Sequence, residues 1–224
     1  LRDVVVSSRA MRTLTIDVVA DVVCPWCFIG KRRLDAALAG LPDVAATVRH
    51  VPFLLDPSTP EGGVDLRERL RAKYRADPEG MFPRVEAEAR ASGIPLDFAR
   101  VRRTFPTLAA HTLLRHAAAR GTQPALLEAL YAGYFLEGSD LGDVAVLAAL
   151  AGGHGFTPEE VARIVADEDE RAVTRAEASA VAAQGVTGVP FFLFDDRIAA
   201  SGAQPVTTIR GAIERCLAER GDRP

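Results

Sequence analysis

The alternation of hydrophobic and polar positions predicts a strand, a helix and a second strand within the first 55 residues. Residues 13–23 are β-branched and apolar almost throughout, which is typical of a buried strand. A helical stripe of apolar positions follows, at Cys27, Leu34, Leu38 and Leu41. Gly40 and Pro42 end this helix, and residues 46–55 form a second strand-like run. A strand–helix–strand unit predicts that the two strands are parallel.

The middle of the chain is predicted to be almost entirely helical. A connector rich in Pro and Gly occupies residues 56–63. The predicted helices cover residues 64–76, 78–92, 106–120, 123–137, 143–152, 158–168 and 170–184. Thr122 and Asp143 are candidate helix caps, and Thr157 with Glu160 has the spacing of a capping box.

Strand character returns near the C-terminus. The run Val189–Phe194 and the shorter run Arg197–Ala200 flank a turn at Asp195-Asp196, which predicts a hairpin. Pro205 then opens a last helix, in which Cys216 lies on the apolar stripe and is expected to fill the core. The predicted order is strand, helix, strand, a long helical block, two strands and a helix.

Composition narrows the class of protein. The chain has 224 residues, of which 48% are hydrophobic and 25% charged, so it can bury a core as one large domain or two small ones. A net charge of −3 argues against a general binder of nucleic acid or anionic membranes. No apolar run is long enough to span a bilayer. Residues 1–11 are interpreted as an N-terminal extension, because Met11 stands just before the first predicted strand.

Three cysteines, at positions 24, 27 and 216, are too few and odd in number for a secreted disulfide scaffold. We therefore expect a cytoplasmic protein in which the motif Cys24-Pro25-Trp26-Cys27 carries redox or metal chemistry. A structural zinc ion needs four ligands, and only Cys216 and four scattered histidines remain to complete a site. The redox interpretation is favoured, with no metal and no cofactor beyond the Cys24–Cys27 disulfide itself.

The position of the motif explains its expected reactivity. Cys24 stands where the first strand ends and the helix begins, and Pro25 suits the first helical position. The unpaired amides and the positive dipole end of the helix favour the thiolate of Cys24 over its thiol. Cys24 is expected to be exposed and to attack a disulfide, whereas Cys27, one turn later, resolves the mixed disulfide. Lys31, Arg32 and Arg33 are expected to be solvated.

Three motifs in this order resemble the DsbA family, and specifically its cytoplasmic FrnE-like branch, over residues 12–220. The motifs are residues 24–32 (CPWCFIGKR), 185–192 (GVTGVPFF) and 201–205 (SGAQP). The resemblance implies an α/β thioredoxin-like fold with a large α-helical domain inserted after the second strand. The thioredoxin-like domain would comprise residues 12–58 and 170–220, and the inserted helical domain residues 59–169.

The resemblance also implies a second part of the site. An X-Pro bond between apolar residues at the start of a buried strand suits a cis proline, so Pro190 is expected to be cis and to lie against the CxxC pair. The backbone of Val189 would then pair with substrate. Pro25 and Trp26 are expected to touch substrate as well, and His111 is a candidate for lining the site. Relatives tend to have Asn at the position of Pro106, so the chain departs from them close to His111.

These features predict a thiol–disulfide oxidoreductase whose substrate is a protein or a small molecule, with no nucleic-acid or membrane partner. An alternative is a glutathione-dependent isomerase or transferase, related to 2-hydroxychromene-2-carboxylate isomerase and the kappa-class glutathione transferases. In that family a serine usually replaces the first cysteine, whereas this chain keeps both Cys24 and Cys27. A binding or chaperone-like module would not need the pair. The substrate, the net direction, the recycling partner and homodimer formation stay open.

Overall fold

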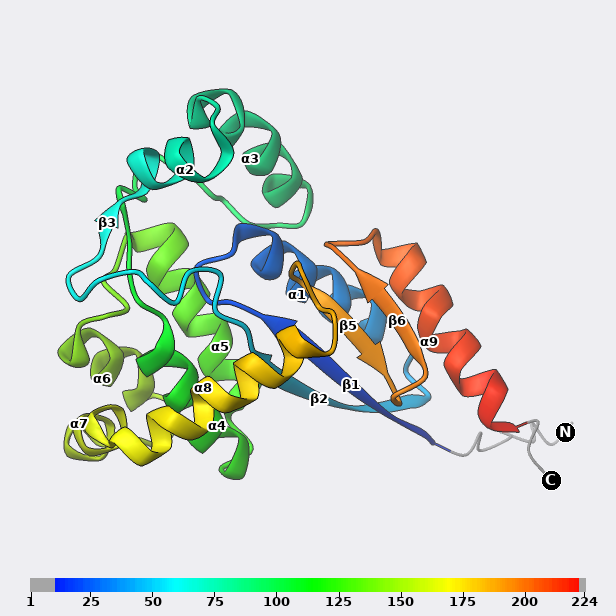
Figure 1. Cartoon of the computed structure of the whole chain (residues 1–224). Helices are drawn as coiled ribbons and strands as arrows, with labels where there is room; N and C mark the ends of the chain where they lie inside the picture. Colours follow the sequence, from blue (N-terminus) through cyan, green and yellow to red (C-terminus); the bar gives the residue numbers. More distant parts are fainter. Residues whose placement is uncertain (1–10, 222–224) are drawn as a thin grey trace, which may run out of the picture.

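A computed structural model describes residues 11–221 of the chain, so the predicted extension at residues 1–11 lies almost entirely outside the described residues. Its centre is a four-stranded sheet in the order β2-β1-β5-β6 (Figure 1). The strands are β1 (Arg12–Ala20), β2 (Val44–Pro52), β5 (Phe191–Phe194) and β6 (Ile198–Ser201). β1 and β2 are parallel, whereas β5 runs antiparallel to both β1 and β6. The parallel pair and the hairpin are confirmed.

Helix α1 (Pro25–Ala39) connects β1 to β2 and packs against the last helix, α9 (Val206–Gly221). The apolar stripe of α1 is buried at Cys27 and Leu34, and the chain leaves the helix at Gly40, as the sequence predicts. Cys216 is fully buried in α9, where its thiol lies 3.5 Å from the carbonyl oxygen of Phe194. Its predicted place in the core is confirmed.

All the remaining helices lie between β2 and β5 in the chain (Figure 1). They are α2 (Leu66–Tyr74), α3 (Phe82–Ala91), α4 (Leu108–Ala119), α5 (Gln123–Ala132), α6 (Val144–Gly152), α7 (Pro158–Ala166) and α8 (Glu168–Ala183). Three of them, α4, α5 and α8, contact β2. The thioredoxin-like fold with a helical insertion after the second strand is therefore confirmed, whereas the domain boundary at residues 169 and 170, which falls inside α8, stays a prediction.

The structure corrects several local predictions. The predicted helix 78–92 is divided into a short 3-10 turn (Pro78–Gly80) and α3, which begins at Phe82 with Pro83 in its first turn. The predicted helix 123–137 ends in a π-helical turn, Gly133–Glu137. Two-residue strands β3 (Val64–Asp65) and β4 (Arg103–Thr104) pair with each other and were not predicted, since two residues show no alternation.

The predicted caps are confirmed at two of three positions. The Asp143 side chain accepts a hydrogen bond from the amide of Ala145, and Thr157 forms a capping box with Glu160. The Thr122 hydroxyl, by contrast, makes no capping hydrogen bond, because the Thr122 backbone is not in the extended conformation that aims a cap side chain at the helix.

Candidate active site

Cys24 is the N-cap of α1, with extended backbone angles (φ −94°, ψ 114°) and Pro25 directly after it. A turn brings the chain from β1 into the helix, because the Cys24 amide donates to the carbonyl oxygen of Asp21 over 3.1 Å. The Cys24 carbonyl oxygen in turn accepts from the amide of Cys27 over 3.0 Å. These bonds place the two cysteines on successive turns of backbone at the start of α1, as the motif predicts.

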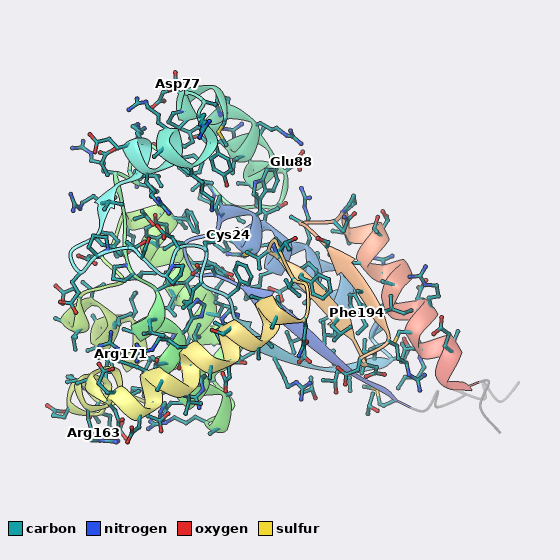
Figure 2. All side chains as sticks on the ribbon, viewed as in Figure 1. Cys24, Asp77, Glu88, Arg163, Arg171 and Phe194 are labelled. Atoms are coloured by element: carbon teal, nitrogen blue, oxygen red, sulfur yellow. The ribbon has the colours of Figure 1, made fainter. Side chains whose placement is uncertain are left out.

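The two thiols differ in their surroundings. Cys27 has no exposed surface, and burial raises the pKa of its thiol well above the ordinary value, with a further rise from its hydrogen bond to Cys24. Cys24 is 5% exposed, so the expectation that it lies open on the surface is wrong. It is reached instead through a cavity, because the inserted helices α2 and α3 cover this end of the sheet (Figure 2).

The cavity has a volume of about 450 Å³ and lies between the start of α1, helices α2 and α3 and the loop before β5. Apolar side chains dominate its lining, Val23, Leu66, Leu70, Phe82, Val85, Phe98, Phe105 and Phe135 among them. Two cations, Arg69 and Lys73, contribute to the lining from α2, and Arg69 forms an ion pair with Asp56. The lining therefore suits a ligand with an apolar portion, and Arg69 and Lys73 place positive charge next to it.

Val189 and Pro190 complete the site opposite the cysteines. Their peptide bond is cis, as predicted. The Val189 carbonyl oxygen lies 3.8 Å from the Cys24 sulfur, where it accepts a weak hydrogen bond from the thiol. Pro190 packs against Gly30, in the second turn of α1, so this loop lies directly against the helix that carries the pair.

The other predicted residues have mixed outcomes. Pro25 and Trp26 line the cavity and Trp26 is partly exposed, so both lie where substrate contact is expected. His111 does not line the cavity. It is 1% exposed and binds Asp21 instead, because α4 packs against β2.

Two of the three basic residues after the motif differ from the prediction that they are solvated, whereas Arg32 is exposed as predicted. Lys31 forms ion pairs with Asp35 and Glu128, and Arg33 binds Glu88 and Ser92 of the α3 region. The side chains of Lys31 and Arg33 are each only 14% exposed.

Sequence reasoning missed Asp21 and His50. Asp21 is 1% exposed and lines the cavity together with Cys24. Its carboxylate accepts hydrogen bonds from the amide of Leu55, over 2.8 Å, and from His111, over 3.1 Å. A lone aspartate inside the apolar run Val18–Val23 was the available signal, since a charged residue in a buried strand needs a partner.

Comparisons with known proteins agree with this geometry. The family model for a DsbA-like thioredoxin domain matches residues 15–214. This chain belongs to the DsbA-like family. A crystal structure of a probable DsbA oxidoreductase from Streptomyces coelicolor is 34% identical, with a TM-score of 0.84, over 94% of this chain and 92% of that chain. Among curated proteins, none matches the sequence.

Two more distant structures share the fold of this DsbA-like protein. A 2-hydroxychromene-2-carboxylate isomerase is 15% identical, with a TM-score of 0.70, over 93% of this chain and 98% of that chain. The cytosolic disulfide reductase DsbM from Pseudomonas aeruginosa, solved with GSH, is 18% identical, with a TM-score of 0.59, over 92% of this chain and 97% of that chain. Family membership makes this chain a disulfide oxidoreductase. Within residues 11–221, no helix has the length and apolar character to cross a membrane.

Proposed function

We propose that this DsbA-like protein exchanges disulfides through Cys24 and Cys27, and that its substrates are disulfides small or slender enough to enter the cavity over Cys24. The observation that carries the proposal is the position of Cys24. It caps a helix at the floor of an apolar cavity, next to the Val189 carbonyl and in contact with a second, fully buried thiol. The helix terminus stabilises an attacking thiolate there, and Cys27 is in place to displace the product.

The proposed reaction transfers two electrons. The Cys24 thiolate attacks one sulfur of the substrate disulfide, so that a mixed disulfide forms and the other sulfur leaves as a thiolate that takes a proton. Cys27 then loses its proton and attacks the Cys24 sulfur. The second substrate thiol is released, the substrate has been reduced by two electrons, and the enzyme holds the Cys24–Cys27 disulfide. Two thiols, or one dithiol, restore the enzyme by the reverse sequence: the first opens the Cys24–Cys27 disulfide to a mixed disulfide, the second releases Cys24, and the two leave joined as a disulfide, with no resident cofactor and no metal.

Other parts of the proposal concern context. Assignment to the FrnE-like branch is supported by the three motifs around positions 24, 190 and 202. A cytoplasmic location is supported by the odd count of three cysteines and by the likeness in fold to the cytosolic DsbM.

Comparing wild type with Cys27→Ser tests the function. With an excess of a dithiol reductant to restore the enzyme, wild type should catalyse the reduction of both insulin and a small disulfide such as oxidised glutathione over multiple turnovers. The small disulfide should react faster, because Cys24 is reached through the cavity. Cys27→Ser should stop at a mixed disulfide on Cys24, detected by mass spectrometry. Cys216→Ala is the matched control, a buried cysteine outside the site, and should keep turnover. Full turnover by Cys27→Ser would instead favour the glutathione-dependent isomerase or transferase.

A further inference from the structure

A second cavity adjoins the active-site cavity at the N-terminal end of α4, and we call it the α4 cavity. It has a volume of about 610 Å³. Asp56, Thr59 and Thr107 line both cavities, so the two spaces meet at these residues. A slender substrate whose sulfur lies at Cys24 can therefore extend past them into the α4 cavity.

The N-terminus of α4, a helix of 12 residues, opens into this cavity. Leu108 and Ala109, the first two residues of the helix, are part of the lining. The amides in the first turn of an α-helix have no acceptor within the helix, and they form the positive end of its dipole. The N-cap residue Thr107 supplies no acceptor either, because its side chain makes no capping hydrogen bond. These amides are therefore available to a ligand.

Thr107 itself is a second, independent sign of a ligand. It is 7% exposed and lines the α4 cavity, yet its hydroxyl has no hydrogen-bond partner among residues 11–221. Its backbone angles (φ −103°, ψ −3°) are not those of an extended N-cap, so the side chain is not aimed at the amides of α4. A buried hydroxyl without a partner costs free energy. An acceptor atom in the cavity would satisfy it.

Helix α8 adds positive charge to the lining. Arg171, Arg175 and Ser179 are spaced four residues apart, so they share one face of α8, and all three line the α4 cavity. Glu168 accepts from Nη1 of Arg171 and from Nη2 of Arg175, each over 3.2 Å. Nε of Arg171 is buried and has no partner within the described part of the chain. Each guanidinium group therefore keeps donors that Glu168 does not use.

Acidic groups near the α4 cavity reduce this positive charge without cancelling it. Asp56 lines the cavity but forms an ion pair with Arg69. Glu61 lies exposed on the loop before β3, and Glu168 is 68% exposed and does not belong to the lining. The lining therefore carries a small excess of positive charge beside a helix N-terminus. Such a site suits a singly charged carboxylate better than a doubly charged phosphate.

Resting on the proposed function, we propose that the α4 cavity is a carboxylate subsite for the substrate. It binds an acidic group at the far end of a disulfide whose sulfur lies at Cys24. The first-turn amides of α4, the Thr107 hydroxyl and the unused donors of Arg171 and Arg175 bind the carboxylate oxygens. The apolar lining over Cys24 accommodates the chain between the sulfur and the acid. The substrate class is therefore slender disulfides with an acidic end.

The subsite is tested with straight-chain disulfides that end in a carboxylate on each side, in a series of chain lengths, and with the diamides of the same lengths. The full-length protein turns these over with an excess of a dithiol reductant. Once the chain is long enough to reach the α4 cavity, wild type should prefer the diacid to the diamide by roughly tenfold in kcat/KM, as expected for hydrogen bonds between charged groups. Shorter diacids should show no such preference.

Three variants change the lining. Arg171→Gln should abolish the preference for the long diacid, chiefly through KM, and Thr107→Val should reduce it. Arg175→Gln should reduce it as well, and this side chain is 46% exposed, so its loss does not endanger folding. Arg163→Gln is the matched control, an exposed arginine on α7 outside the lining, and it should keep the preference. Figure 2 labels Arg163 and Arg171. Thermal unfolding shows whether each variant is folded.

The outcomes separate the subsite from the function beneath it. If wild type reduces diacids and diamides equally well, or if Arg171→Gln and Arg175→Gln keep its preference, the subsite is overturned and the proposed function stands. A preference that is lost in Lys73→Gln instead also overturns the subsite, because the carboxylate is then bound in the active-site cavity. If wild type reduces neither these disulfides nor insulin and oxidised glutathione, the proposed function fails.

Discussion

Two thiols separated by one helical turn meet different conditions in this site. Cys24 reaches the cavity, whereas Cys27 is enclosed and the pKa of its thiol is raised by burial. A small alkylating reagent should therefore modify Cys24 first, and Cys27 should react only above the pH of about 8.5 at which free cysteine ionises. Fragment-ion mass spectrometry of the labelled peptide distinguishes the two sites. Faster labelling of Cys27 or Cys216 would reverse the proposed roles.

His50 links the stability of the fold to pH. Burial lowers the pKa of its imidazole well below the ordinary value, and the neighbouring His111 adds to the effect. Below about pH 6.5 the unfolded chain binds a proton at this position and the folded chain does not, so stability falls as the pH falls. His50→Gln should remove up to about 1.4 kcal/mol per pH unit of this dependence. Urea unfolding of both proteins at pH 5 and pH 7 measures this pH dependence. If the free energy of unfolding changes equally with pH in wild type and His50→Gln, the lowered pKa of His50 is contradicted.

At the scale of elements, α1 lies in close contact with the loop before β5. A methyl group at Gly30 would lie 2.8 Å from Cγ of Pro190 and 3.1 Å from Cζ of Phe192. Gly30→Ala should therefore lower both turnover and stability, the latter by about 1–2 kcal/mol, since overpacking exceeds the gain in helix propensity. Gly211→Ala in α9 is the control, with nothing within 4 Å, and should stabilise by about 0.5–1 kcal/mol. Thermal unfolding measures the stability of the two variants, and reduction of glutathione disulfide measures their turnover. Unchanged turnover in Gly30→Ala would show that the loop moves to make room for the methyl group.

At the scale of the whole molecule, Arg33 joins three parts of the chain. From α1 it donates to Glu88 and Ser92 in and after α3 and, over 2.7 Å, to the carbonyl oxygen of Ala203 before α9. Figure 2 labels Glu88 on α3. The hydrogen bonds of Arg33 therefore hold α3, one of the helices that cover Cys24, against the domain that contains the sheet.

Arg33→Ala should cost about 1–3 kcal/mol of stability, as expected for lost hydrogen bonds to a charged group. Cys24 should become more reactive, because the cover over the cavity loosens. Thermal unfolding and the alkylation rate measure the two effects. Arg84→Ala, an exposed position on α3, should change neither. A protein as stable as wild type, with Cys24 equally slow to react, would show that the apolar contacts of α2 and α3 suffice.

The fold and half of the site were predictable from sequence because their signals are local. The CPWC motif and the run around Pro190 each predict their local structure from only a few consecutive residues. The Asp21–His111 and His111–His50 contacts were not predictable, since Asp21 and His111 are 90 positions apart and His111 and His50 are 61 apart. Nothing near either histidine indicates a partner, and only the packing of α4 against the sheet brings them together. The enclosure of Cys24 likewise depends on how α2 and α3 fold over it.

The insertion between β2 and β5 also affects the nascent chain, because it delays synthesis of the loop that faces the cysteines. Cys24 and Val189, which touch in the finished site, are separated by 165 positions. At a ribosomal speed of about 5–20 residues per second, the cysteines are made roughly 8–33 seconds before the loop that faces them. In that interval β1 lacks its neighbour β5, and both thiols are open to any oxidant or stray disulfide. The nascent protein is therefore most easily damaged at its reactive pair, and a reducing environment during synthesis protects the yield of active enzyme.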